Sequence, residues 1–200
     1  MRVTHKPYSE SCDQNQTPIL EVIQPVLANC RQVLEIGSGT GQHAVAFARA
    51  MPQLTWHTSD CPENHPGIHL WLEEAGLENI SLPIALDVLQ DDWPGYAVDA
   101  IFTANTAHIM HWPEVEAMFM GGGKMLNEGG HFLMYGPFNY NGQFTSESNA
   151  QFDLWLKARD PLSGIRHFEE IDGQANKAGM SLKNDFTMPA NNRILHWIKS

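Results

Sequence analysis

The segment from Val33 to Ala44 constrains the fold most, because it joins an apolar strand to a glycine-rich turn and then to the start of a helix. The glycines of the turn are Gly37, Gly39 and Gly41. At alternate positions they let the backbone turn tightly and approach a ligand that a Cβ atom would exclude. The helix that follows presents unpaired N–H groups and the positive end of its dipole to the same space. This order of elements is typical of an α/β protein that binds a nucleotide.

The turn departs from the dinucleotide-binding fingerprint Gly-x-Gly-x-x-Gly/Ala at its last position. That fingerprint needs a small residue where this chain has Gln42, because the helix packs closely there and the pyrophosphate approaches it. Glu35, at the end of the strand, would repel a pyrophosphate but would attract the ammonium group of an amino-acid-like ligand. S-adenosylmethionine carries that ammonium group and no phosphate. We expect the residues nearest to it to be Glu35, Gly37, Ser38, Gly39 and Gly41.

Apolar runs alternate with helical patterns along the rest of the chain, which is typical of βαβ units around a parallel sheet. We expect strands at residues 32–36, 54–59, 81–86, 98–104, 130–135, 182–188 and 193–198, and helices at 17–27, 41–51, 69–75, 113–126, 151–159 and 168–178. The last two strands should form a hairpin. The predicted fold class is α/β, with a Rossmann-like, doubly wound, seven-stranded sheet that is mostly parallel and has an antiparallel C-terminal strand.

Three segments carry more specific expectations. Thr17 and Pro18 indicate a helix start, so residues 1–16 are expected to form a polar N-terminal arm. The glycines at 121–123 lower helix propensity by about 1 kcal/mol each relative to alanine, which predicts a break in the helix or a close packing contact. Residues 136–149 form a long stretch rich in Asn, Gly, Ser and Phe, and we expect it to act as a lid, with an ordinary ordered loop as the alternative.

Composition narrows the class of protein. The 200 residues suit a single domain. A formal net charge of -11 argues against a nucleic-acid-binding protein, which usually carries a basic face. Three widely spaced cysteines fit a reducing compartment, so we expect a cytoplasmic protein. No stretch approaches the ~20 apolar residues that span a bilayer, and no apolar run follows Met1, so we expect neither membrane insertion nor secretion.

Polar residues follow the predicted strands where a ligand would lie, since a doubly wound sheet binds ligands beyond the carboxyl ends of its strands. Asp60 follows the second strand and can accept hydrogen bonds from both ribose hydroxyls. Asp87, with Val88 beside it, follows the third strand and can bind the adenine amino group. Asn105 follows the fourth strand, where it would face the reactive end of the ligand. A helix cap or turn is the alternative role for either acid alone.

Further motifs are spread along nearly the whole chain. They read Gln14-Asn15-x-x-Pro18, Gly37-Ser38-Gly39-x-Gly41, Asn105-x-Ala107-His108, Tyr135-Gly136-Pro137-Phe138, Asp160-Pro161-x-x-Gly164 and Met188-Pro189-Ala190-Asn191-Asn192. With them the chain resembles the class I, seven-stranded S-adenosylmethionine-dependent methyltransferases, and more narrowly an uncharacterised methyltransferase-like family, domain of unknown function 938. One departure is Gln14, where that family usually has arginine. The resemblance implies the fold, S-adenosylmethionine as cofactor and methyl transfer, but no particular acceptor.

Methyl transfer from a sulfonium is an in-line displacement. The protein must align the nucleophile with the methyl group and exclude water, and it needs a base only if the nucleophile carries a proton. His108 is the best candidate base, because it follows the fourth strand and imidazole titrates near neutrality. Packing against the next helix is its alternative role. Tyr135 is the second catalytic candidate, and the residues expected to line an acceptor pocket are Asn15, Asn139, Asn149 and Asp153.

The spacing of Cys61, His65 and His69 is suggestive of a metal site, but intervening prolines and a glycine prevent a common helical face, so we expect no metal.

The leading hypothesis is a methyltransferase that acts on a small, largely uncharged or apolar acceptor, without nucleic-acid or membrane partners. A catalytically silent S-adenosylmethionine sensor and an NAD-dependent oxidoreductase are the alternatives, and Gln42 and Asp87 argue against the latter. The sequence indicates neither the acceptor nor the oligomeric state.

Overall fold

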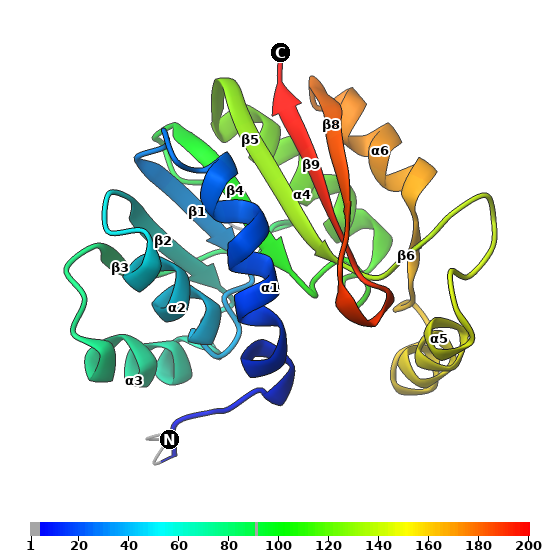
Figure 1. Ribbon diagram of the computed structural model, residues 1–200, viewed down its shortest axis with the longest axis horizontal. Coiled ribbons are helices and arrows are strands. Elements are labelled where there is room, and N and C mark those ends of the chain that lie inside the picture. The colour runs from blue at the N-terminus through cyan, green and yellow to red at the C-terminus, as the bar shows by residue number, and fades with distance from the viewer. Residues whose placement is uncertain (1–4, 91) are drawn as a thin grey trace.

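The computed structural model describes residues 5–90 and 92–200, and a seven-stranded sheet forms its centre (Figure 1). The strands of this sheet are β1 (Gln32–Ile36), β2 (Thr55–Asp60), β3 (Ile80–Ala85), β4 (Val98–Ala104), β5 (Leu126–Gly136), β8 (Met180–Thr187) and β9 (Arg193–Lys199). They lie in the order β3-β2-β1-β4-β5-β9-β8. All neighbours are parallel except that β9 runs antiparallel to both β5 and β8. The predicted Rossmann-like fold and its C-terminal hairpin are therefore confirmed.

Helices cover both faces of the sheet, except for residues 147–159, which form a helix at its carboxyl edge (Figure 1). The helices are α1 (Glu10–Val26), α2 (Gln42–Ala50), α3 (His65–Ala75), α4 (Trp112–Met125), α5 (Glu147–Arg159) and α6 (Phe168–Lys177). On one face α1 and α2 enclose a cluster in which the rings of Phe47 and Phe102 lie 5.4 Å apart. On the other face α4 and α6 cover Phe119 and Trp197, whose ring centroids are 5.6 Å apart. Strands buried on both faces read as continuous apolar runs, which is why the sequence predicts β1 and β4 well.

The carboxyl ends of β1, β2, β4 and β5 lie along one edge of the sheet, because these strands are parallel. The N-terminal part of α1, the turn between β8 and β9, and α5 all lie at this same edge (Figure 1). A ligand site expected beyond the strand ends is therefore enclosed by segments from both ends of the chain. Within the described ranges, no helix combines the length and the apolar character needed to cross a bilayer.

Helix α1 begins at Glu10, which corrects the expected start at Thr17. Ser9 caps the helix, since its side chain accepts a hydrogen bond from the Cys12 amide, and Pro18 is accommodated inside. Residues 10–16 of the expected arm are thus helical, and residues 1–4 lie outside the described part of the chain. The polar sequence of this first part conceals the helix, because its inner face meets a cavity instead of the core.

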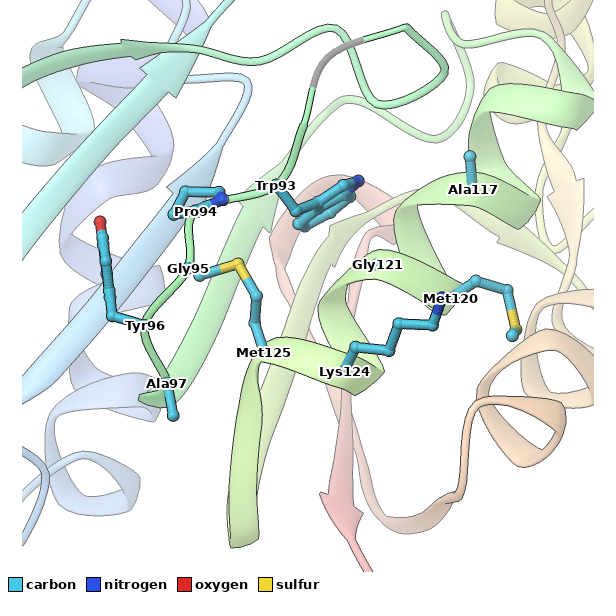
Figure 2. A pocket seen from close by; sticks show the side chains of 10 residues that line it. All are labelled: Trp93, Pro94, Gly95, Tyr96, Ala97, Ala117, Met120, Gly121, Lys124 and Met125. Carbon is cyan, nitrogen blue, oxygen red and sulfur yellow. The ribbon is translucent and has the colours of Figure 1, made fainter.

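Helix α4 continues unbroken through its three glycines, so the expected break is wrong and the alternative, close packing, is confirmed. A Cβ atom on Gly121 would lie 2.0 Å from the ring of Trp93, whose position over the helix is visible in Figure 2. A Cβ on Gly123 would lie 2.7 Å from the carbonyl oxygen of Ala178. The glycines let α4 approach α6 and the residues before β4 more closely than any other side chain would allow.

The segment expected as a lid contains regular structure. Strand β6 (Phe138–Asn139) pairs in parallel with β7 (Arg166–His167), and a tight turn joins Tyr140 to Gln143. Helix α5 begins at Glu147, four residues before the expected start, because Ser146 caps it by accepting a hydrogen bond from the Asn149 amide. Residues 136–149 therefore carry α5 to the ligand edge of the sheet, and their action as a lid stays a prediction.

Replacing Gly123 with alanine tests the close packing of α4. Helix propensity alone would stabilise the variant by about 1 kcal/mol, whereas overpacking against the Ala178 backbone costs about 1–3 kcal/mol. We expect Gly123→Ala to lower the free energy of unfolding measured in urea. Gly173→Ala in α6 is the matched control, since a Cβ there meets no atom within 4 Å, and it should raise that free energy. Stabilisation by both substitutions would contradict the packing argument.

Candidate functional site

A cavity of about 1060 Å³ lies at the carboxyl edge of the sheet. Its walls come from the first half of α1, the glycine turn after β1, the loop after β4, helix α5 and the β8–β9 turn. Its volume is at the upper end of the roughly 300–1,000 Å³ typical of small-molecule sites. The cavity lining brings together nine of the residues predicted from the sequence: Asn15, Gly37, Ser38, Gly39, Asp60, Asn105, His108, Tyr135 and Asn149.

The glycine turn is held in place by β2. The amides of Gly37 and Ser38 both donate to the carbonyl oxygen of Ser59, each at 3.0 Å. Gly37 has a positive φ of 72°, and a Cβ there would lie 2.6 Å from the methyl group of Thr106. Gly41 packs against Ile68 of α3 and does not line the cavity. The turn therefore presents open backbone at Gly39, where a Cβ would meet no atom within 4 Å, whereas the absence of a Cβ at Gly37 makes room for Thr106.

Asp60 is fixed beside this turn at the end of β2. Its Oδ2 accepts a hydrogen bond from the Gly39 amide at 2.7 Å. Its Oδ1 accepts from the Cys61 amide and from the Asn64 side chain, both at 2.8 Å. These donors aim the carboxylate at the cavity, and a carboxylate has lone pairs left for further donors.

Glu35 lies beneath the glycine turn and does not line the cavity. Its Oε2 accepts hydrogen bonds from Ser38 Oγ at 2.9 Å and from Trp56 Nε1 at 3.1 Å. Burial raises the pKa of Glu35 to about 7, although both hydrogen bonds lower it. Near neutral pH this carboxyl group is therefore poised to gain or lose its charge when a charged group arrives nearby.

Gln42, which departs from the dinucleotide fingerprint, binds the backbone of the segment before α1. Its Oε1 accepts from the Ser9 amide at 2.6 Å, and its Nε2 donates to the Ser9 carbonyl oxygen at 3.2 Å. The indole N–H of Trp71 also donates to the carbonyl oxygen of Pro7 at 2.6 Å. These bonds hold the first half of α1 over the glycine turn, where Ser11, Cys12, Gln14 and Asn15 line the cavity.

A buried polar network joins α1 to α2. His43 Nε2 lies 2.6 Å from Asn15 Oδ1, and His43 Nδ1 lies 3.9 Å from Cys12 Sγ. Burial lowers the pKa of His43 to about 4, so its ring is neutral at neutral pH. Burial raises the pKa of Tyr135, and a hydrogen bond from Asn15 partly offsets this. Sequence reasoning gave no role to His43, although its position two residues after Gly41 places it at the start of the helix that follows the turn.

The loop after β4 places Asn105 and His108 in the cavity. Asn105 has a positive φ of 60°, a strained conformation that Asn tolerates better than most residues. The ring of His108 packs edge-on against Phe152 of α5 at 5.3 Å. Burial lowers the pKa of His108 to about 4, with Arg166 contributing. The imidazole is therefore neutral at neutral pH and is a weak base.

The β8–β9 turn and α5 close the cavity, a contribution that sequence reasoning missed except for Asn149. Asn149 Nδ2 donates to Thr145 Oγ1 at 2.9 Å and to the Asn191 carbonyl oxygen at 3.2 Å. Ala190 and Asn191 both have positive φ, of 55° and 58°. The missed lining residues in these two segments include Phe152, Trp155, Pro189, Ala190 and Asn192. Strain in a surface turn is typical of a functional position, and it cannot be read from the sequence.

Besides Glu35 and Gly41, four predicted residues lie outside the cavity lining. Asn139 is in β6, where its amide donates to the Ile165 carbonyl oxygen at 3.3 Å. Asp153 accepts from the Ile165 amide at 2.8 Å and from Lys157 at 2.6 Å, so it fixes the loop after α5. Neither is among the residues that line the cavity, and their expected role at an acceptor stays a prediction. Asp87 accepts from the Leu89 amide at 3.0 Å, and Val88 joins the apolar core; neither is part of the cavity lining.

In the described part of the chain, no group of three or more His, Cys, Asp or Glu side chains is arranged to hold a metal ion. His65 Nε2 instead lies 2.9 Å from the Asp60 carbonyl oxygen.

A second hollow, of about 580 Å³, lies between residues 93–97 and α4, at the amino end of β4 (Figure 2). It is lined by Trp93, Met120 and Lys124 among others and holds none of the predicted site residues.

Known structures share this fold. An O-methyltransferase family protein from Burkholderia thailandensis matches with a TM-score of 0.83 at 18% identity, over 96% of this chain and 58% of that chain. The S-adenosylmethionine-dependent methyltransferase SibL matches with a TM-score of 0.80 at 22% identity, over 94% of this chain and 55% of that chain. The mitomycin 7-O-methyltransferase MmcR matches with a TM-score of 0.82 at 15% identity, over 95% of this chain and 54% of that chain. The chain spans little more than half the length of these proteins, and it has the fold of the class I S-adenosylmethionine-dependent methyltransferases.

The sequence itself identifies the family. Residues 6–199 match the family described as "Protein of unknown function (DUF938)". The match covers almost all of the chain, and the protein belongs to this family.

The buried carboxyl of Glu35 predicts a pH-dependent stability. Its pKa is raised from 4.5 to about 7 on folding, so the folded state holds the proton more tightly than the unfolded state. The free energy of unfolding should therefore fall as pH rises from 4.5 to about 7, and this contribution should be constant above that range. Glu35→Gln should remove this fall, as measured by urea denaturation across the same range. An unchanged profile in the variant would contradict the assigned burial of the carboxyl group.

Proposed function

We propose that this protein transfers a methyl group from S-adenosylmethionine to a small-molecule acceptor. The observation that carries the proposal is the open glycine turn beside the fixed carboxylate of Asp60, because the two face one large cavity at the strand ends. Gly39 leaves room for close approach of a ligand, since a Cβ there would meet no atom within 4 Å, and Asp60 offers free lone pairs to a diol. The fold shared with S-adenosylmethionine-dependent methyltransferases supports the same donor.

Each end of the donor has a suggested neighbour. The amino-acid end would lie at the glycine turn, above Glu35 and Ser38, where a positive ammonium group meets a buried carboxyl. The ribose hydroxyls would bind Asp60. Asp87 and Val88 would meet the adenine after β3, although they lie outside the cavity lining. The sulfonium methyl would point toward Asn105, His108 and Tyr135, which enclose the space left for an acceptor.

The geometry also separates the proposal from its alternatives. Gln42 fills the place of a small residue and binds the Ser9 backbone, which disfavours the close pyrophosphate contact of an NAD-dependent oxidoreductase. A domain that only senses S-adenosylmethionine would have the same donor site. The cavity continues beyond that site to Phe152 and Trp155, and this additional space favours an enzyme with an acceptor.

Calorimetric titration tests the donor site. S-adenosylmethionine and its demethylated product should bind, and NAD should not. Asp60→Ala should weaken donor binding about 10- to 100-fold, because hydrogen bonds to charged groups contribute about 1.5–3 kcal/mol. Glu78→Ala changes an exposed carboxylate outside the cavity and should leave the affinity unchanged. Binding of NAD alone would refute the proposal, and an unaltered affinity in Asp60→Ala would remove Asp60 from the site.

Donor binding should also depend on pH through Glu35. A nearby ammonium group favours the charged carboxylate, so binding should lower the Glu35 pKa from about 7 and release protons. The affinity should increase from about pH 5.5 to about pH 7 and then level off. Glu35→Gln should abolish this increase. Titrations in buffers with different ionisation enthalpies measure the protons released, and equal release by the variant would contradict the role of Glu35.

A further inference from the structure

The charge of the cavity lining limits the acceptor. Among the lining residues that the structure describes, Asp60 and Glu114 are charged negatively, and none is a lysine or arginine. Two nearby cations do not line the cavity. The Nε and Nη2 atoms of Arg166 donate to the carbonyl oxygens of Ala107, Met110 and Leu162. The guanidinium of Arg159 lies over the ring of Trp155, 4.6 Å from its centroid. An acceptor that bears a carboxylate or a phosphate would therefore lose its hydration without gaining an ion partner.

The lining also lacks a side chain that is suited to remove a proton at neutral pH. His43 and His108 are buried and neutral, and burial lowers the pKa of each to about 4. Both oxygens of Asp60 already accept N–H donors, and Glu114 Oε2 accepts the His111 amide at 2.7 Å. General-base catalysis is most effective when the pKa of the base lies near the operating pH. An acceptor that must lose a proton, such as an alcohol, would find little help here.

Helix α5 contributes aromatic rings to the cavity lining. The ring of His108 meets that of Phe152 at 5.3 Å, and Phe152 stacks on Trp155 at 5.7 Å with an interplanar angle of 18°. Both Phe152 and Trp155 line the cavity. Aromatic rings offer apolar area to a planar molecule, and they attract positive charge through their π-electrons.

From this combination we propose that the acceptor is an uncharged aromatic nitrogen heterocycle, methylated on a ring nitrogen to give a cation. The inference rests on the proposed function. The nitrogen lone pair forms the new N–CH₃ bond as the S–CH₃ bond breaks, and the bonding pair returns to sulfur. Sulfonium becomes neutral thioether while the heterocycle becomes an N-methyl cation, so no proton is transferred. The positive charge passes from sulfur to nitrogen in a cavity whose lining includes two carboxylates and the rings of Phe152 and Trp155.

Ring nitrogens differ from other amines in whether their lone pair is free at neutral pH. Aliphatic amines of the lysine type have a pKa near 10 and are protonated at neutral pH, so their lone pair is blocked until a base removes the proton. Ring nitrogens of the imidazole type have a pKa near 6.5 and are largely neutral above pH 7. Their lone pair is free without help from the protein.

The test uses the full chain and probes built on one ring system. Calorimetry in the presence of S-adenosylhomocysteine compares quinoline, N-methylquinolinium and quinoline-4-carboxylate. The neutral and cationic probes should bind, and the carboxylate should bind at least about tenfold more weakly, because its charge is buried unpaired. With methyl-labelled donor, quinoline should be labelled faster than 1-naphthol, a hydroxyl compound of similar size. Preference for the carboxylate or for the naphthol would overturn the proposal. The proposal would also be overturned if the donor binds but no heterocycle binds or is labelled. Failure of the donor itself to bind would instead refute the proposed function.

A charge placed in the lining gives a second, independent readout. Gln14 lines the cavity from α1, so Gln14→Arg should raise affinity for quinoline-4-carboxylate and lower affinity for N-methylquinolinium. Gln24→Arg adds the same charge to α1 outside the cavity lining and should leave both affinities unchanged. Equal shifts in the two variants would mean that net charge, rather than the charge of the cavity, decides the preference. That outcome would overturn the proposal.

Discussion

The candidate site depends on the carbonyl oxygen of Ser59, which accepts the amides of both Gly37 and Ser38. These two bonds join the turn after β1 to the end of β2, and the next residue along the chain is Asp60. The Gly39 amide then donates to the Asp60 carboxylate, which completes the connection. Without a Cβ at Gly37 the turn also fits against Thr106 of the loop after β4. The backbone of the glycine turn thus contacts the end of β2 and the loop after β4, which brings three strand ends together.

The parts of the fold that follow from local pattern were predicted from the sequence. Buried strands such as β1 and β4 are short apolar runs. Of the residues expected near the donor, Gly37 directly follows β1 and Asp60 is the last residue of β2. The first half of α1 was not predicted, because its inner face meets a cavity and carries Cys12, Gln14 and Asn15 in place of apolar residues. Amphipathic periodicity fails where a helix covers a ligand site instead of a core.

The acceptor side was predicted least well, for a different physical reason. Asn139 and Asp153 resemble ligand-binding residues in sequence, yet each satisfies backbone groups of Ile165 in a buried loop. Phe152, Trp155 and Ala190 reach the cavity through contacts between segments about 40 residues apart. A polar residue that holds a loop and one that binds a ligand have the same local signature, so only the three-dimensional arrangement separates them.

The pairing of Gln42 with Ser9 has a consequence for how the site can change. Both hydrogen bonds run to the backbone of Ser9, so its side chain contributes nothing to them. The position of α1 therefore depends on these backbone bonds and on the contact between Asn15 and His43, and not on the side chains of Ser11 or Gln14. Substitutions at Ser11 or Gln14 can reshape one wall of the cavity while the helix stays in register over the glycine turn. New acceptor preferences can arise on this helix without loss of the donor site below it.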